Sequence, residues 1–257
     1  HTSKIISLSE LFSINLKYNE KLINLENGFD GIYFDKTNTN LLQKFALGVL
    51  TADCLPIVIL VFNNFLDLKN LGLKSNNNTQ DNKINQDILI LECPLECFVL
   101  GTIIHAGWKG LFNNIIFNFF ELFKKEYLVY HLEYNVLVYI GPSIRKCCYV
   151  VDYDFVINNK ISERFYFQNI YNNNNINNNN EQYSNTTVLN TKVHLDLVSF
   201  SIHQIKNLIQ KFKINHLKLV ISEECTYCSN KYFSYRKGNN NERNITILSV
   251  YNNNLCM

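Results

Sequence analysis

The stretch Phe98-Val99-Leu100-Gly101-Thr102-Ile103-Ile104-His105-Ala106-Gly107-Trp108-Lys109-Gly110 decides the fold of this chain. Its first seven residues form a mostly apolar run that is typical of a buried strand. After Gly107, apolar residues recur at helical spacing, at Leu111, Ile115, Ile116, Phe119, Leu122 and Phe123. The sequence therefore predicts a strand that gives way to a helix, with His105 at the junction. Such junctions commonly carry the chemistry of layered α/β proteins.

A second segment, Thr51-Ala52-Asp53-Cys54-Leu55-Pro56, interrupts the almost continuously apolar run from Lys44 to Phe62. A polar step and a proline inside such a run predict two strand pieces with a kink between them. Cys54 is either a small core residue, the usual fate of a free thiol, or part of a site. The polar step favours a site because burying it costs free energy.

Further strands and one further helix are expected toward the C-terminus. Strands are predicted over Asn135 to Ile140, Val193 to Leu197, Leu217 to Ile221 and Ile245 to Val250. The helix follows Leu197, and a polar-aromatic loop runs from Cys225 to Arg243. The predicted fold class is α+β with α/β-type layering, in which helices cover mixed β-sheets.

Composition excludes several classes of partner. A net charge of +2 from 24 basic and 22 acidic residues gives no reason to expect a nucleic-acid partner. No apolar segment is long enough to span a membrane. Eight scattered cysteines are too few for a disulfide scaffold and suit a reducing compartment, so we expect a cytoplasmic protein.

Asparagine dominates the polar residues, with 41 in the chain. Two low-complexity tracts, residues 75–86 and 171–185, cannot bury enough apolar surface to offset the cost of ordering them. We therefore expect disordered insertions in one domain covering residues 1–257. Because the chain begins at His1, we expect this domain to be excised from a longer protein.

Cys54 and His105 are the principal candidates for chemistry, because each places a metal-binding side chain at the end of an apolar run. A thiolate and an imidazole on rigid strand ends can form most of a zinc site with an open position. Taken alone, His105 is equally well explained as a core histidine with satisfied hydrogen bonds.

Several other residues could bind anions or metal. Lys109, together with the backbone N–H groups at the start of its helix, could receive a phosphate, and Arg236 or Arg243 could bind an anion. Cys225 and Cys228 have the spacing of half a zinc knuckle, and Cys93 with Cys97 could supply another half. The alternatives are a simple helix-start lysine for Lys109 and solvated loop side chains for Arg236 and Arg243.

Several segments in fixed order resemble the YfiH family, the laccase-domain proteins now regarded as purine nucleoside phosphorylases with adenosine deaminase activity. The resemblance covers nearly the whole chain. It rests on Thr51 to Pro56, His105 to Gly110, Ile140-Gly141-Pro142-Ser143-Ile144, Cys147-Cys148-Tyr149-Val150, His194-Leu195-Asp196-Leu197, Cys225-Thr226 and Phe233-Ser234-Tyr235-Arg236.

The resemblance implies a zinc ion held by His1, Cys54 and His105, since the segment that starts at His1 is similar to the family's first ligand segment. It also implies a catalytic role for Cys54 and His105, and an acid-base or orienting role for Asp53. Phosphate would bind Lys109, Arg236 and Arg243, which are candidates by charge and position. Lys109 departs from the family's usual arginine, and Asn241-Glu242-Arg243 departs from its Thr-Gly-Arg step.

The function we expect is a zinc-dependent purine nucleoside phosphorylase acting on adenosine, inosine, guanosine or methylthioadenosine, with adenosine deamination left open as a second activity. Oligomeric state is also left open. Three alternatives remain. They are a copper-dependent polyphenol oxidase, a metal-free hydrolase that uses Cys54 with His105 as base, and a non-catalytic metal-binding interaction module.

Overall fold

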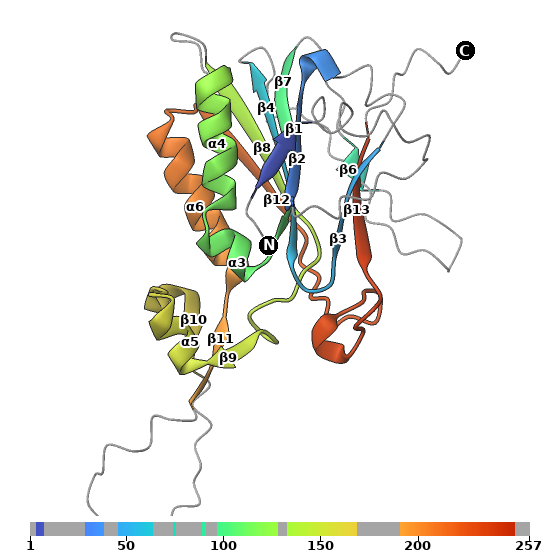
Figure 1. Ribbon diagram of the computed structural model, residues 1–257, viewed down its shortest axis with the longest axis vertical. Coiled ribbons are helices and arrows are strands. Elements are labelled where there is room, and N and C mark those ends of the chain that lie inside the picture. The colour runs from blue at the N-terminus through green and yellow to red at the C-terminus, as the bar shows by residue number, and fades with distance from the viewer. Residues whose placement is uncertain are drawn as a thin grey trace, which may run out of the picture.

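A central mixed sheet organises the computed structural model, which describes residues 4–7, 29–38, 46–63, 74–75, 89–90, 97–127, 133–168 and 191–249. The sheet has six strands, and Figure 1 shows them running side by side. Their order is β1 (Ile5–Ser7), β2 (Gly31–Asp35), β7 (Phe98–Ala106), β4 (Leu55–Asn63), β8 (Tyr134–Ile140) and β12 (His216–Ile221).

The middle of this sheet is antiparallel and its two edges are parallel. Strand β7 pairs antiparallel with β2 and β4, and β4 pairs antiparallel with β8. The outer pairs β1–β2 and β12–β8 are parallel. The long apolar runs of β4 and β7 occupy the centre because both of their faces are covered.

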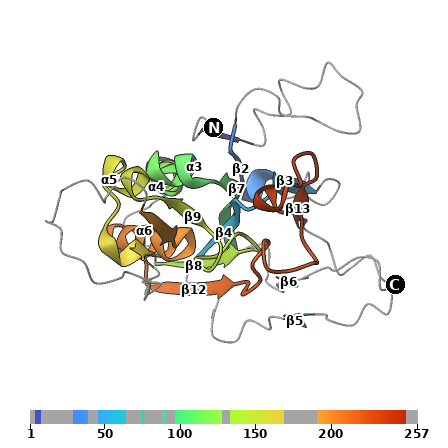
Figure 2. The same cartoon turned by 90° about the horizontal axis from the view of Figure 1, so that it is seen from below.

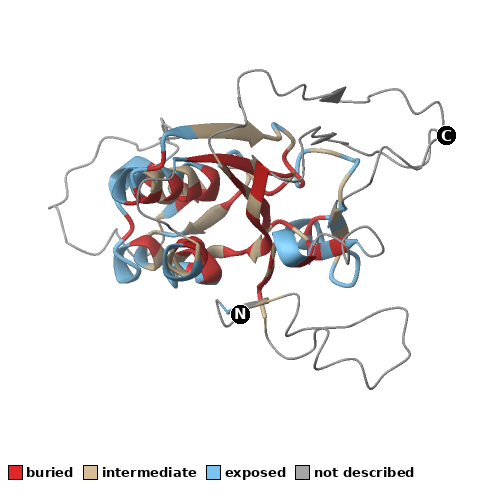
Figure 3. Ribbon diagram, turned by 90° about the horizontal axis from the view of Figure 1, so that it is seen from above, coloured by how far each residue is buried: buried red, intermediate tan, exposed pale blue. Residues whose placement is uncertain are grey.

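Helices cover one face of the sheet. Figure 2 shows α3 (Trp108–Phe112), α4 (Ile115–Glu126) and α6 (Leu197–Lys211) together on that side. Helix α4 buries Ile115, Ile116, Phe119, Phe120 and Phe123. Figure 3 shows these buried faces turned toward the sheet, with exposed residues on the outside.

The single helix predicted after Gly107 is divided in two. Asn113 and Asn114 separate α3 from α4, and Asn114 has a φ of 60° in the left-handed region. Asparagine adopts this conformation more readily than most residues. Helix α3 therefore has only five residues.

A two-stranded ribbon lies on the opposite face of the sheet. It pairs β3 (Leu47–Thr51) with β13 (Asn244–Leu248) in antiparallel register. The predicted kink is the turn Ala52–Cys54, where the chain leaves this ribbon and enters β4. A second apolar cluster, including Phe34, Val58 and Phe62, lies between the ribbon and the sheet.

Smaller elements complete the described chain. A three-stranded sheet has the order β10 (Tyr166–Phe167), β11 (Lys192–Leu195) and β9 (Val150–Asp152). Strands β5 (Lys74–Ser75) and β6 (Leu89–Ile90) form a short antiparallel pair. The remaining elements are η1 (Lys36–Asn38), α5 (Tyr153–Asn158), η3 (Glu163–Phe165) and η5 (Tyr235–Lys237).

The predicted layering of mixed sheets with helices is confirmed. Each predicted strand is present with its ends shifted by a few residues, as Val193–Leu197 becomes Lys192–Leu195. Apart from Ser75, the low-complexity tracts 75–86 and 171–185 lie outside the described residues, so their predicted disorder stays a prediction. Among described helices, none is long and apolar enough to cross a membrane.

Candidate functional site

Cys54 and His105 lie beside each other at one end of the central sheet. Leu55 pairs with Ala106 and Pro56 with His105, so Cys54 falls opposite Gly107. A Cβ atom added at Gly107 would lie 3.0 Å from the Cys54 Sγ. The absence of a side chain at Gly107 therefore gives the Cys54 sulfur its place next to the His105 segment.

His105 is fixed from the neighbouring strand. Its backbone N–H donates to the Asp30 carbonyl oxygen at 2.7 Å, and its Nδ1 lies 3.9 Å from the Asp30 Oδ1. Burial lowers the pKa of His105, and the negative charge of Asp30 only partly offsets this. The imidazole is therefore neutral at pH 7, which is the form that binds metal ions.

The Cys54 thiol is strongly disfavoured as a thiolate. Burial, with the nearby charges of Asp53 and Asp30, raises the pKa of Cys54 to about 11. A cysteine nucleophile needs the opposite shift. A coordinated divalent cation, in contrast, deprotonates a thiol outright.

Asp53 holds the turn that carries Cys54. It is buried with a φ of 82°, in the left-handed region that an aspartate adopts at some cost. Its carboxylate accepts the Thr226 hydroxyl at 2.7 Å and the Arg236 backbone N–H at 2.9 Å. Its carbonyl oxygen accepts the Ile144 N–H at 3.0 Å. Two distant loops thus hold this turn.

The two candidate arginines lie close to this turn. The Arg236 guanidinium donates to the Val150 carbonyl at 2.9 Å and lies 5.0 Å from the Tyr149 ring centre. The charge of Arg243 lowers the pKa of both Cys54 and His105, which places it within electrostatic reach of that pair. Both side chains are exposed at the surface, as an anion site requires.

Lys109 has a different setting. It is exposed on α3, and its Nζ lies 5.4 Å from the centre of the Trp108 ring. Because α3 has only five residues, its N-terminus cannot supply the dipole of a full helix. The phosphate role of the α3 backbone is therefore not supported, although the Lys109 charge remains.

His1 lies outside the described residues, so the structure places two of the three predicted zinc ligands. Those two suit a zinc ion in their chemistry, since a thiol and a neutral imidazole are both preferred ligands. The glycine opposite the Cys54 sulfur is consistent with a site of this kind.

Sequence reasoning missed three features of the region. It gave the Asp30 carboxylate no role, and it did not link Thr226 to Asp53. It also paired Cys225 and Cys228 with Cys93 and Cys97. The structure instead places Cys147 and Cys148 next to Cys225 and Cys228. Cys97 is buried immediately before β7, and Cys93 lies outside the described residues.

Curated relatives of the chain carry the name purine nucleoside phosphorylase. The protein from Aquifex aeolicus is 23% identical over 251 residues, covering 97% of this chain and 79% of its own length. The protein from Borreliella burgdorferi is 28% identical over 137 residues, which is 52% of this chain and 48% of that protein. The chain thus spans only about half of the second relative.

Solved structures share the fold. YlmD from Geobacillus stearothermophilus has a TM-score of 0.55 at 18% identity, covering 98% of this chain and 71% of that one. The hypothetical protein YfiH from Bacillus licheniformis has a TM-score of 0.50 at 17% identity, covering 87% of this chain and 62% of that one. At these identities the likeness establishes the architecture alone.

A family model matches residues 99–250, which is more than half of the chain. The matched region includes His105, the Cys147–Cys148 pair and the loop that bears Arg236 and Arg243. With the shared architecture, this match confirms the predicted resemblance. The chain belongs to the family described as multi-copper polyphenol oxidoreductase laccase, which includes the YfiH-like proteins.

Proposed function

We propose that this protein is a zinc-dependent purine nucleoside phosphorylase, with adenosine, inosine, guanosine and methylthioadenosine as its substrate class. The observation that carries the proposal is the strand register that sets Cys54 beside the His105 segment, with Gly107 leaving room for the sulfur. Relatives named purine nucleoside phosphorylase support the substrate class.

Cys54, His105 and His1 would hold the zinc ion in this proposal. When bound, zinc would supply a Lewis acid with an open coordination position. The Asp30 carboxylate, 3.9 Å from Nδ1, would help to orient the neutral His105 ring.

Phosphate would meet the guanidinium groups of Arg236 and Arg243. Arginine suits this task because its planar fork matches two phosphate oxygens. The contact of the Arg236 backbone with Asp53 ties the phosphate-binding loop to the turn that carries Cys54. Because both Asp53 oxygens accept hydrogen bonds here, we assign Asp53 a positioning role. Lys109 is retained as a third candidate on its charge alone.

Phosphorolysis would then join a phosphate oxygen to the anomeric carbon of the ribose as the bond to the purine nitrogen breaks. The purine leaves with the electron pair of that bond and takes up the proton that the attacking hydrogen phosphate gives up. The arginines keep the attacking phosphate in place, which contributes to catalysis by orientation.

The alternatives make different demands on the same residues. A metal-free cysteine hydrolase requires an ionised Cys54, which the raised pKa of about 11 disfavours. A copper polyphenol oxidase, as in the family's description, would need a cluster of histidines. The described histidines other than His105 have separate settings. One example is His194, whose Nδ1 lies 2.7 Å from the Lys146 carbonyl oxygen.

The test is to incubate zinc-loaded protein with each nucleoside, with and without phosphate, and to separate the products by chromatography. We expect free purine and ribose 1-phosphate only when phosphate is present, and loss of both products in His105→Ala. His203→Ala, a histidine on α6 whose ring lies 5.5 Å from that of Phe165, is the matched control and should keep its activity.

Other outcomes would identify the alternatives. Phosphate-independent conversion of adenosine to inosine would add the deaminase activity. Oxygen uptake with phenols and copper would favour the oxidase. Failure of every zinc-loaded sample to process a nucleoside would contradict the proposal and favour a binding module.

A further inference from the structure

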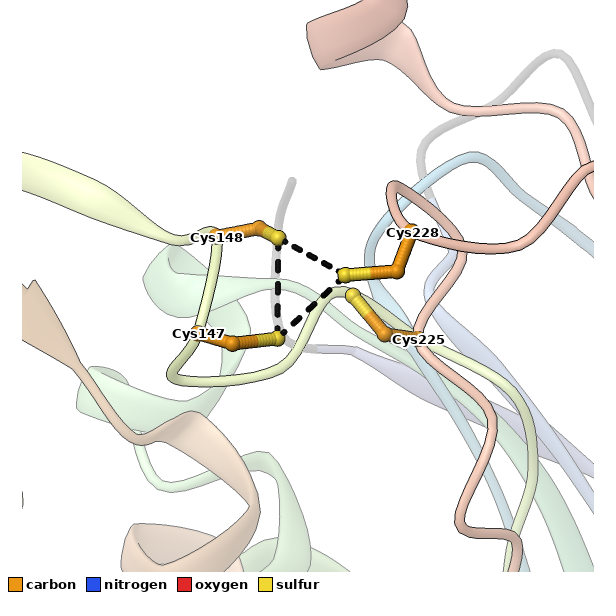
Figure 4. A group of neighbouring side chains, drawn as sticks. All are labelled: Cys147, Cys148, Cys225 and Cys228. Atoms are coloured by element: carbon orange, nitrogen blue, oxygen red, sulfur yellow. Dashed lines mark hydrogen bonds between the residues drawn. The ribbon is translucent and has the colours of Figure 1, made fainter.

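Four cysteines from two loops converge at the surface, some distance along the chain from Cys54. Cys147 and Cys148 lie between β8 and β9, and Cys225 and Cys228 follow β12. Figure 4 shows the four sulfur atoms pointing toward one another across the gap between these loops. All four lie within 4.8 Å of one another, and they are the only such group of potential metal ligands among the described residues.

The spacing of the sulfur atoms fits a tetrahedral metal site. The Cys148 Sγ lies 3.5 Å from that of Cys147 and 3.1 Å from that of Cys228. The Cys147 and Cys228 sulfurs are 3.6 Å apart. Four thiolates at the zinc–sulfur distance of about 2.3 Å stand about 3.8 Å from one another. The cluster therefore needs little rearrangement to surround one ion.

The loop from Cys225 to Cys228 has the hydrogen bonding of a metal knuckle. The Arg145 backbone N–H donates to the Cys225 Sγ at 3.5 Å. Burial by itself would raise the pKa of Cys225, but backbone N–H groups of Cys228, Arg145 and Tyr227 lower it to about 7. Such donors stabilise a thiolate and tune metal–thiolate sites.

Cys147 and Cys148 lack that support, and a nearby cation would favour their ionisation. Burial raises the pKa of Cys147 to about 11 and raises that of Cys148 as well. Four adjacent thiolates would repel one another strongly without a positive charge between them. Cys147 and Cys228 are exposed, so an ion can reach the cluster from solvent.

We propose that Cys147, Cys148, Cys225 and Cys228 together bind one structural zinc ion, separate from the site at Cys54 and His105. Four protein ligands leave no open position, which is the pattern of a structural site. Thiolate ligands favour zinc over hard cations such as magnesium or calcium. This proposal does not depend on the proposed function.

The ion would join the two loops that hold the Asp53 turn. Thr226, which donates to Asp53, lies within the knuckle, and its N–H donates to the Ser143 carbonyl at 3.1 Å. Ser143 and Cys225 also form an isolated β-bridge. Bound zinc would therefore restrain Thr226 against the Asp53 carboxylate.

The experiment measures the zinc content of the full chain and of three variants purified under reducing conditions. We expect Cys147→Ser/Cys228→Ser to lose one equivalent of zinc relative to the unchanged chain. Cys97→Ser, which alters a buried cysteine outside the cluster, should lose none. Cys54→Ala should retain the cluster's equivalent. Equal zinc in the double variant and the unchanged chain overturns the proposal.

Cobalt substitution distinguishes this site from the proposed catalytic one. Cys54→Ala loaded with cobalt should keep the intense thiolate charge-transfer absorption of a four-sulfur site, and Cys147→Ser/Cys228→Ser should lose most of it. If Cys54→Ala also loses this absorption, the four-cysteine site is refuted. The phosphorolysis assay is independent of this result, so either proposal can fail without the other.

A measurement on the unchanged chain guards against a double variant that does not fold. Alkylation with peptide mapping should show Cys147 and Cys228 modified at least about tenfold more slowly with zinc bound than after chelation. Equal rates contradict the proposal. A disulfide between Cys148 and Cys228 in protein isolated under reducing conditions would also contradict it and indicate a redox pair.

Discussion

Cys54 and His105 are placed by the central sheet, whereas the four-cysteine cluster is placed by two loops that meet outside it. The first pair inherits its position from strand register, in which Pro56 pairs with His105. The cluster has one isolated bridge, between Ser143 and Cys225, and the hydrogen bonds around it. Strands hold a site more precisely than loops do, so a bound metal ion would add more order to the loop-borne cluster than to the pair on the sheet.

The largest effect should follow from removing a ligand of the sheet-borne site. Cys54→Ala should lower phosphorolysis by more than about 100-fold, because losing a ligand costs more than losing one of its supporting contacts. The fold should persist, since the strands on both sides remain paired. Product chromatography with zinc analysis measures this, with Cys97→Ala as control. Undiminished turnover in Cys54→Ala would remove Cys54 from the site.

The two regions should also differ in how their thiols titrate. In zinc-free protein the pKa of Cys54 is raised to about 11 and that of Cys225 is lowered to about 7. The rate of alkylation of Cys225 should therefore increase with pH with a midpoint near 7, whereas the rate for Cys54 should have its midpoint near 11. Peptide mapping after alkylation at a series of pH values measures both. A midpoint below pH 8 for the alkylation of Cys54 would favour the metal-free cysteine hydrolase instead.

The raised pKa of Cys54 also predicts how the free energy of unfolding changes with pH. Between pH 9 and pH 11 the unfolded chain has lost the Cys54 proton while the folded chain keeps it, so the zinc-free fold is destabilised as pH rises. Below pH 9 the thiol is protonated in both the folded and the unfolded chain, so this pH-dependent loss of stability is absent there. We expect the free energy of unfolding, measured with denaturant, to fall less between pH 9 and pH 11 for zinc-free Cys54→Ala than for the zinc-free unchanged chain. An equal fall in both proteins would contradict the raised pKa of Cys54.

A smaller effect should follow from crowding the Cys54 sulfur. Gly107→Ala places a Cβ 3.0 Å from that sulfur, so Cys54 must shift and zinc affinity should fall about tenfold. Gly110→Ala is the matched control, because its nearest contact would be 3.7 Å, an ordinary distance. Competition with a coloured chelator measures both affinities. Equal affinities in the two variants would show that Gly107 does not shape the site.

The smallest effect should come from the second asparagine tract. Deleting Asn172–Asn180 should leave melting temperature and turnover nearly unchanged, because such a polar sequence contributes little apolar burial. Thermal unfolding and the phosphorolysis assay check this. A marked fall in melting temperature would show that the tract is packed structure.

Strand positions could be predicted from the sequence because β4 and β7 are long apolar runs. The pairing of the strands could not be predicted, because β3 leaves the central sheet and pairs with β13, which lies nearly 200 residues later in the chain. Periodicity reports which face of a strand is buried and carries no information on its partner. The break at Asn113–Asn114 was hidden because apolar spacing continues across it.

The difference between local patterns and long-range contacts also explains which parts of the candidate sites could be predicted from the sequence. Cys54 and His105 stand out because each follows or ends an apolar run, so a local pattern reveals them. The Cys225–Cys228 spacing was also visible locally, but its partners at Cys147 and Cys148 are set by the tertiary approach of two loops. The contacts of Asp53 with Thr226 and Arg236 are likewise long-range.

The hydrogen bonds from Thr226 and Arg236 to the Asp53 carboxylate have a consequence for how the protein folds during synthesis. The groups that satisfy its buried carboxylate lie 173 and 183 residues further along the chain. A ribosome adding about 5–20 residues each second therefore exposes this turn for roughly ten seconds or more before its partners are synthesised. Until then the nascent chain carries a carboxylate that cannot be buried without its partners. Translation that stops before Thr226 should leave a product that proteases recognise.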